Sequence, residues 1–299
     1  MRSLDSQGIA SGETEPTLAS NVGFWEDVRS SFRRLDPADY PEVTSCSREE
    51  AYGNGDNMAP GGLYLAARMT RSMNLMEGDI VLDIGCGRGD SSVFLARRFG
   101  VTVVCFDLWI SSTFLSRKAV KAGCRNMVLP LDLDASNELP FPDDYFDMLF
   151  CMQSLHTFGA SPNVLRQLIR HLKPGGRFAV GGTCFNEEPL EGELPRIYER
   201  TDDWAAEYSN YHSPPWWKAA FEATRLAEVT ECFELTEGLI MWEDEVLSSG
   251  DRARWSEVWC RRAKWLVDQL IYSRSHRPYL THYILNAQKK GGRGSLNDR

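Results

Sequence analysis

The chain has 299 residues, of which 42% are hydrophobic, and carries a formal net charge of −9 with a sequence pI near 5.2. This length allows one elaborated α/β domain or one domain plus a small cap, and the acidic balance argues against nucleic acid or an anionic membrane as the main partner. The 8 cysteines include no Cys-x-x-Cys pair, so we expect no zinc or other metal site and no disulfide framework. The N-terminus lacks a basic-then-apolar segment and no run of about 18 apolar residues occurs, which predicts a soluble cytoplasmic protein.

The N-terminal region carries few signals of regular structure. Residues 1–20 are polar and are expected to be disordered. Apolar residues at helical spacing predict a helix over 24–35 that covers an apolar surface. The stretch 52–62 is too rich in glycine for regular structure, and the pattern after it predicts a helix over 63–73.

A strand, a tight turn and a helix are predicted over residues 80–98. The apolar run from Ile80 ends at Asp83, and three glycines then lead into an amphipathic run; they are Gly85, Gly87 and Gly89. Glycine lets a ligand lie against the backbone, and the following helix directs free N–H groups to the same place. The spacing matches neither the G-x-G-x-x-G dinucleotide fingerprint nor a P-loop. The preceding carboxylate suits a ligand with an ammonium group; an ordinary glycine-rich loop is the alternative.

A second acid ends the next predicted strand. The β-branched run over 101–106 is followed by Asp107, about 20 residues after the glycines, where an acid accepts hydrogen bonds from ribose hydroxyls. The pattern continues with a predicted helix over 108–123 and strands over 127–133 and 145–152. These two acids and the glycine turn favour an aminoacyl nucleoside as the ligand.

Four motifs follow one another at workable intervals: Asp83-x-Gly-x-Gly-x-Gly, the Asp107 acid, Leu139-Pro140-Phe141 with Phe146-Asp147, and Leu172-Lys173-Pro174-Gly175-Gly176. Together they resemble those of the class I S-adenosylmethionine-dependent methyltransferases, over residues 60–185 and in outline elsewhere. The resemblance is greater to members that modify small molecules than to those acting on nucleic acids. It implies an α/β fold with a Rossmann-like seven-stranded methyltransferase sheet, strand order 3-2-1-4-5-7-6, an antiparallel last strand and a helical cap.

The resemblance implies S-adenosyl-L-methionine as the cofactor. Its predicted binding residues are Asp83, Gly85, Cys86, Gly87, Gly89, Asp107, Leu108, Asp134, Ala135 and Gln153. Asp83 and the glycines would hold the methionine moiety, Asp107 the ribose, and Asp134 with the Ala135 N–H the adenine. Asp132 is the alternative for adenine binding, because the stretch before Leu139-Pro140-Phe141 has one residue more than the commonest spacing in this family. In this family a loop such as 52–62 can close over the cofactor; a plain surface connection is the alternative.

The residues after the strand over 145–152 are the candidates for catalysis and acceptor binding. Ligands of open α/β sheets bind beyond the carboxyl ends of the strands, where the strand order reverses. Ser154, as a substrate-binding residue, and His156 fall at this point. Methyl transfer needs alignment rather than covalent catalysis, but the acceptor's proton can need a base, for which His156 is the first candidate and His212 the second. Alternatively, each histidine hydrogen-bonds a neighbouring backbone group.

A substrate-side insertion that mixes acids with aromatic residues is predicted over 186–225. Tyr211 and Trp216 are its predicted substrate-binding residues. Aromatic faces and carboxylates suit an amine, amino acid or thioether acceptor that becomes a charged ammonium or sulfonium. Alternatively, the tryptophans bury a helical cap and the acids face water.

The remaining pattern completes the predicted domain plan. The cofactor-binding core spans 63–185, ending with a helix over 162–172 and a strand over 177–182, and follows an N-terminal cap and lid over 21–62. C-terminal strands with an inserted long helix fill 226–288. The elements expected after the core are a helix over 216–225, a strand over 227–235, a helix over 239–273 and a strand over 279–287. Residues 289–299 are expected to be disordered.

The predicted function is methyl transfer from S-adenosylmethionine to a small-molecule acceptor by in-line displacement. One alternative is a synthase that uses the same cofactor on the same scaffold, cyclopropane-forming or decarboxylating. Another is a non-catalytic regulatory protein that binds S-adenosylmethionine. The small-molecule acceptor is the expected partner, and a homodimer is left open as the oligomeric state.

Overall fold

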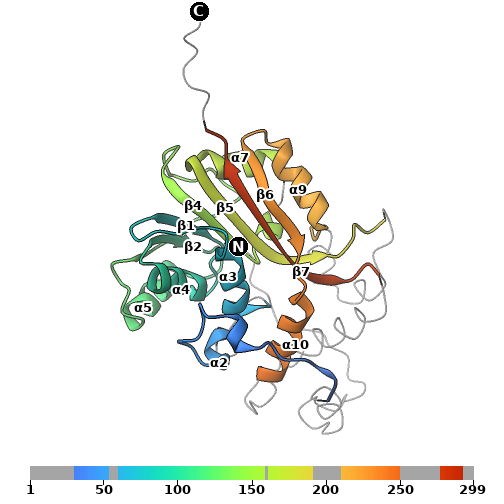
Figure 1. The fold of residues 1–299 in the computed structure, drawn as a ribbon. Coiled ribbons are helices and arrows are strands. Elements are labelled where there is room, and N and C mark those ends of the chain that lie inside the picture. Colours follow the sequence, from blue (N-terminus) through green and yellow to red (C-terminus); the bar gives the residue numbers. More distant parts are fainter. Residues whose placement is uncertain (1–29, 54–59, 159–160, 191–209, 250–276, 292–299) are drawn as a thin grey trace, which may run out of the picture.

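The computed structural model describes residues 30–53, 60–158, 161–190, 210–249 and 277–291 (Figure 1). Its strands are β1 (Ile80–Ile84), β2 (Thr102–Phe106), β3 (Val128–Leu131), β4 (Phe146–Met152), β5 (Leu172–Phe185), β6 (Ala227–Glu234) and β7 (Leu280–Lys289). They form one seven-stranded sheet in the order β3-β2-β1-β4-β5-β7-β6, in which β7 is antiparallel to both of its neighbours. The pairs from β3 across to β5 are parallel. The predicted fold class and strand order are confirmed.

Helices cover both faces of this sheet. They are η2 (Pro37–Asp39), α2 (Arg48–Ala51), α3 (Gly62–Thr70), α4 (Asp90–Phe99), α5 (Ser112–Lys121), α6 (Leu155–Phe158), α7 (Pro162–Arg170), α9 (Pro214–Ala223) and α10 (Gly238–Ser249). Side chains of a strand alternate between the two faces, so Val81 packs with α3, α4 and α5 while the next residue, Leu82, packs with α7 and α9. Within the described ranges, no helix is both long and apolar enough to cross a membrane.

Two boundaries differ from the sequence-based predictions for local reasons. The helix predicted from residue 108 begins at Ser112, because the Asp107 carboxylate accepts the N–H groups of Trp109 and Ile110 and holds these residues in a turn. The strand predicted from 177 begins at Leu172, and the glycine pair lies within it, where the register against β4 shifts. Glycines inside a strand often mark such an irregularity.

The helix predicted over 24–35 ends early. In its described part the chain is helical only through Ser31. The Arg33 N–H donates to the Glu243 carboxylate at 2.8 Å rather than to a helix carbonyl. Other predictions lie outside the described residues, namely those on 1–20, on 54–59 of the loop, on 191–209 of the insertion, on 250–273 of the long helix and on 292–299 of the tail.

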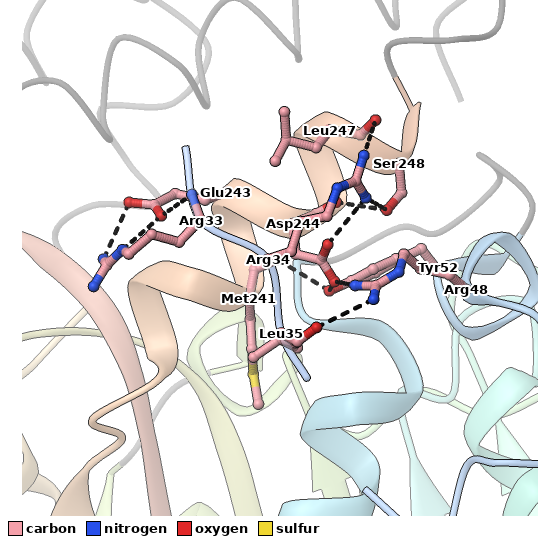
Figure 2. A network of polar contacts seen from close by, with 10 residues as sticks. All are labelled: Arg33, Arg34, Leu35, Arg48, Tyr52, Met241, Glu243, Asp244, Leu247 and Ser248. Atoms are coloured by element: carbon pink, nitrogen blue, oxygen red, sulfur yellow. Dashed lines mark hydrogen bonds and ion pairs between the residues drawn. The ribbon is translucent and has the colours of Figure 1, made fainter. Parts of the chain in front are cut away.

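Two buried acids of α10 bind the N-terminal segment, as Figure 2 shows. Glu243 is 1% exposed and accepts from the Arg33 guanidinium at 2.9 and 3.1 Å. Asp244 is fully buried, accepts from the Tyr52 hydroxyl at 3.0 Å and forms an ion pair with Arg48. Acids this deeply buried are rare unless they are paired. These pairs therefore fix the N-terminal segment against α10.

Candidate active site

The turn after β1 is held against the end of β2. The N–H groups of Gly85 and Cys86 both donate to the Phe106 carbonyl at 3.0 Å. The glycines have positive φ values, +66° at Gly85, +53° at Gly87 and +78° at Gly89. A Cβ added at Gly85 would lie 2.5 Å from the Ser154 Cβ. Only glycine therefore lets the end of β4 approach this turn.

Asp83 lies beside the turn and is 1% exposed. Its Oδ2 accepts hydrogen bonds from the Ser91 and Ser92 hydroxyls at 2.7 Å each, whereas its Oδ1 has no hydrogen-bond partner among the described residues. Burial raises the pKa of Asp83 to about 6, against the opposing effect of the two serines. A buried acceptor without a donor is costly. This oxygen fits the ammonium group of the predicted cofactor.

Asp107, at the end of β2, is 9% exposed. Its carboxylate already accepts hydrogen bonds from three backbone N–H groups. Oδ2 accepts from Gly87 at 2.9 Å, and Oδ1 accepts from Trp109 at 2.8 Å and Ile110 at 3.1 Å. A carboxylate has about four acceptor sites, so it retains capacity for a ribose hydroxyl. The neighbouring Leu108 is 64% exposed, which leaves its side chain accessible to a ligand.

The two acids considered for adenine binding are engaged differently. Asp132 accepts from the backbone N–H of Ser112 at 2.7 Å and from its hydroxyl at 2.6 Å, which ties it to the first turn of α5. Asp134 closes a local turn by accepting hydrogen bonds from Ser136 and Asn137, and the bonds from Ser136 lower the pKa of its carboxyl. Ala135, which directly follows Asp134, is buried. Both carboxylates thus accept local hydrogen bonds, and the choice between Asp134 and Asp132 for adenine stays a prediction.

Gln153 and Ser154 connect the end of β4 to its surroundings. Gln153 has a φ of +58°, a conformation that non-glycine residues rarely adopt and that often occurs at functional sites. Its Nε2 donates to the Pro60 carbonyl at 2.8 Å, and its Oε1 accepts from the N–H of Thr183 at 2.8 Å. The Ser154 hydroxyl donates to the Ile84 carbonyl at 2.7 Å. Both side chains thus hold neighbouring strand ends together.

His156 and Tyr211 come together although 55 positions separate them in the sequence. Their ring centroids are 4.7 Å apart, and the side chains are 6% and 7% exposed. His156 lies on α6, directly beyond the carboxyl end of β4 and two residues after Ser154. Gly85 thus abuts Ser154, and two residues further along the chain His156 packs against Tyr211.

His212 belongs to a second group, at the start of α9. Its Nδ1 lies 2.7 Å from Glu188 Oε1, and its ring stacks on Trp216 with centroids 3.5 Å apart and an 8° interplanar angle. Glu188 Oε2 also accepts from the Ser213 N–H and hydroxyl at 2.9 Å. The sequence analysis did not identify Glu188 as the partner of His212, since no local pattern links the two. Among the described residues, no cluster of three or more His, Cys, Asp or Glu is placed to hold a metal ion.

Comparisons with known proteins agree with this geometry. Residues 81–176 match the family model described as "Methyltransferase domain". The chain is 33% identical over 190 residues to 27-O-demethylrifamycin SV methyltransferase of Amycolatopsis mediterranei, covering 54% of this chain and 69% of that protein. It is 29% identical over 170 residues to phosphoethanolamine N-methyltransferase 1 of Arabidopsis thaliana, covering 56% of this chain but only 34% of that protein.

A solved structure with the same fold is Haemonchus contortus phosphoethanolamine N-methyltransferase 2 in complex with phosphomonomethylethanolamine and S-adenosylhomocysteine. The TM-score is 0.67 at 17% identity, over 86% of this chain and 60% of that one. The family match falls on the strands and turns that carry Asp83, the glycines and Asp107. The chain belongs to the class I S-adenosylmethionine-dependent methyltransferases, enzymes whose methyl donor is S-adenosylmethionine.

Proposed function

We propose that this enzyme transfers the methyl group of S-adenosylmethionine to a hydroxyl oxygen of a small-molecule acceptor by in-line displacement. The supporting observation is the position of His156: Gly85 of the glycine turn abuts Ser154, and His156 lies two residues after Ser154, beside Tyr211. When bound, S-adenosylmethionine supplies a sulfonium-bound methyl group, so an acceptor lone pair forms the new C–O bond as the C–S bond breaks and its electron pair returns to sulfur.

Three acids have separate roles in binding the cofactor in this proposal. Asp83 Oδ1, which has no hydrogen-bond partner among the described residues, accepts a hydrogen bond from the ammonium group. Asp107 accepts a ribose hydroxyl with its remaining acceptor capacity, and Asp134 with the Ala135 N–H binds the adenine edge. Holding the donor and acceptor in a reactive geometry lowers the activation barrier by up to about 7–11 kcal/mol.

His156 is the proposed general base. It takes the proton from the acceptor hydroxyl as the C–O bond forms and then returns it to solvent. An imidazole is suited to this task because its neutral form has one ring nitrogen that accepts a proton. General-base catalysis contributes about 10²–10⁴-fold in rate. Tyr211 packs against the ring and limits its orientation.

Two observations support a hydroxyl acceptor over the amine, amino acid or thioether considered from sequence. The relative matched over the larger share of its length is an O-methyltransferase of demethylrifamycin, whereas the phosphoethanolamine enzyme is matched over about a third. In addition, Trp217 is 1% exposed and stacked on Tyr283, and the Trp216 face is covered by His212. These tryptophan faces are therefore used in packing rather than offered to a cation.

The test is an assay of the purified protein with methyl-labelled S-adenosylmethionine and two panels of acceptors. One panel carries hydroxyl groups on polyketide-like or aromatic frameworks, and the other carries phosphoethanolamine and simple amines. The proposal expects label in an O-methyl product, found by mass spectrometry, together with S-adenosylhomocysteine in equal amount.

The same assay separates the alternatives. Label confined to an N-methyl product would replace the hydroxyl acceptor by an amine. A cyclopropane or decarboxylated product would indicate a synthase on this scaffold. Saturable binding of S-adenosylmethionine without any turnover against either panel would favour a regulatory protein.

A further inference from the structure

The peptide between Pro60 and Gly61, where α3 begins, is held from two sides by buried polar side chains. On one side, Gln153 Nε2 donates to the Pro60 carbonyl at 2.8 Å. On the other, the Gly61 N–H donates to Glu245 Oε2 at 2.9 Å. Gln153 is 9% exposed and Glu245 is 3% exposed. Two distant parts of the chain, the end of β4 and helix α10, thus meet at one peptide.

The orientation of the Gln153 amide is fixed by its own acceptor bonds. Its Oε1 accepts from the Thr183 N–H at 2.8 Å and from the Thr183 hydroxyl at 3.0 Å, so its Nε2 must face Pro60. A Cβ added at Gly182 would lie 3.2 Å from Oε1, which shows how closely β5 packs on this amide. The side chain is therefore a rigid bridge between β5 and the start of α3.

Glu245 supplies a cap that α3 lacks locally. The N-cap residue of α3 is Gly61, with a φ of +96° and no side chain to accept a hydrogen bond. In α2, by contrast, Ser47 and Glu50 form a complete capping box within the helix's own first turn. Glu245 makes for Gly61 the bond that Glu50 makes for Ser47, but from 184 positions away.

His282 lies beneath the same peptide. Its ring carbon Cε1 would be 3.4 Å from a Cβ added at Gly61. Trp242 Nε1 donates to His282 Nε2 at 2.7 Å, and His282 Nδ1 lies 3.2 Å from the Gly238 carbonyl. Full burial lowers the pKa of His282 to about 3, so this ring stays neutral. The neutral His282 ring, held by Trp242 and Gly238, therefore packs against the Pro60–Gly61 peptide on a third side.

We propose that Gln153 and Glu245 are positioning residues for methyl transfer, which together hold the Pro60–Gly61 peptide against the carboxyl edge of the sheet. Gln153 directly precedes Ser154, and Ser154 abuts Gly85 of the cofactor turn, so a shift of the peptide reaches that turn through two adjacent residues. The inference rests on the proposed function for its kinetic readout only. Neither residue needs to touch the cofactor for this role.

The test is a double-mutant cycle on the full-length enzyme, with kcat and the KM for S-adenosylmethionine measured for Gln153→Glu, Glu245→Ala and the double variant. Gln153→Glu keeps the size of the side chain but removes the donor to Pro60. We expect each single variant to lower kcat by about tenfold or more, with the KM changed less than about threefold. Because both act on one peptide, the double variant should be little worse than the poorer single variant.

Glu243→Ala is the matched control, since Glu243 is equally buried on the same helix but binds Arg33. We expect it to lower stability while kcat stays within about threefold of the wild type. Glu245→Gln, whose amide oxygen still accepts from Gly61, should restore most of kcat. Additive losses in the double variant, or an equal kcat loss in Glu243→Ala, would overturn the proposal.

A second readout needs no turnover and keeps the inference separate from the proposed function. Amide hydrogen exchange is measured by NMR at the Gly61 N–H, with S-adenosylhomocysteine bound. Faster exchange in Gln153→Glu and Glu245→Ala, but not in Glu243→Ala, is the expected result. Unchanged exchange in both test variants would contradict the proposed role of Gln153 and Glu245, whether or not the acceptor is a hydroxyl.

Discussion

Helices α3 and α4 begin in the same way and are fixed by different means. Each follows an N-cap glycine in the left-handed conformation without a side-chain cap, Gly61 before α3 and Gly89 before α4. Around the start of α4, Asp83 binds serines only 8 and 9 positions away. The start of α3 is held by residues 93 and 184 positions away. The start of α4 is therefore fixed by residues nearby in the sequence, whereas the start of α3 depends on the completed fold.

The largest expected effect comes from breaking the local turn with Gly85→Ala. The new Cβ would lie 2.5 Å from Ser154 Cβ, in addition to the strain of a φ of +66°. Affinity for S-adenosylhomocysteine should fall at least about 100-fold by calorimetry, equivalent to about 2.7 kcal/mol. Gly123→Ala is the control, because Gly123 has a φ of +73° with nothing within 4 Å of an added Cβ. Equal losses of affinity in the two variants would mean that backbone strain, rather than the contact with Ser154, lowers the affinity.

The next effect sharpens the comparison at the acceptor side of the turn. His156→Gln should lower kcat by about 100-fold, the low end for a general base, while leaving the affinity for S-adenosylhomocysteine unchanged. His171 is a matched control, since it is also buried but bonds the Pro142 carbonyl at the opposite edge of the sheet. His171→Gln should affect urea unfolding rather than kcat. An unchanged kcat in His156→Gln would remove this residue as the base.

A smaller effect is expected from Asp244→Asn, which weakens the contacts of α10 with Arg48 and Tyr52. The Tyr52 hydroxyl and Arg48 would lose their charged acceptor, at a cost of about 1–3 kcal/mol in the free energy of unfolding. Urea denaturation measures this cost. Asp132→Asn, at an exposed carboxyl, should change the same quantity much less. Similar values for both variants would show that the buried contacts of Asp244 do not stabilise the fold.

The smallest effect is a pH dependence of cofactor affinity. Asp83 has a pKa of about 6 in the free protein, and an ammonium ligand favours its ionised form. Affinity for S-adenosylhomocysteine should therefore fall as pH drops through 6, by about tenfold between pH 7.5 and 5, and level off above pH 7. Asp83→Asn should bind more weakly at pH 7.5 and show a flat profile. A flat profile in the wild type would separate Asp83 from the ammonium group.

The difference between the two helix starts also explains what the sequence could predict. The glycine turn with Asp83 was predictable because acid, glycines and helix lie within one short stretch, and Asp107 because it ends the next strand. The strand order followed from the family resemblance that these motifs carry. The buried acids from Glu243 to Glu245 were missed, since three consecutive acids normally indicate an exposed face. Their partners lie in a segment about 200 residues earlier, and no local pattern links the two.

The site shows the same limit. The position of His156 at the end of β4 followed from the sheet order, but its contact with Tyr211 did not. Gln153 was predicted to bind the cofactor, and the structure shows its amide engaged by Pro60 and Thr183. Its cofactor contact therefore stays a prediction. Hydrogen bonds between distant segments depend on how the elements pack, which periodicity and motif spacing do not contain.

A crystal structure with S-adenosylhomocysteine bound tests the central claim most directly. We predict that the ammonium group lies about 3 Å from Asp83 Oδ1, the length of an ordinary hydrogen bond. A ribose hydroxyl should bond Asp107, and the sulfur should face His156. A nucleoside bound away from the glycine turn, or an Asp83 Oδ1 still without a donor in the complex, would contradict the account.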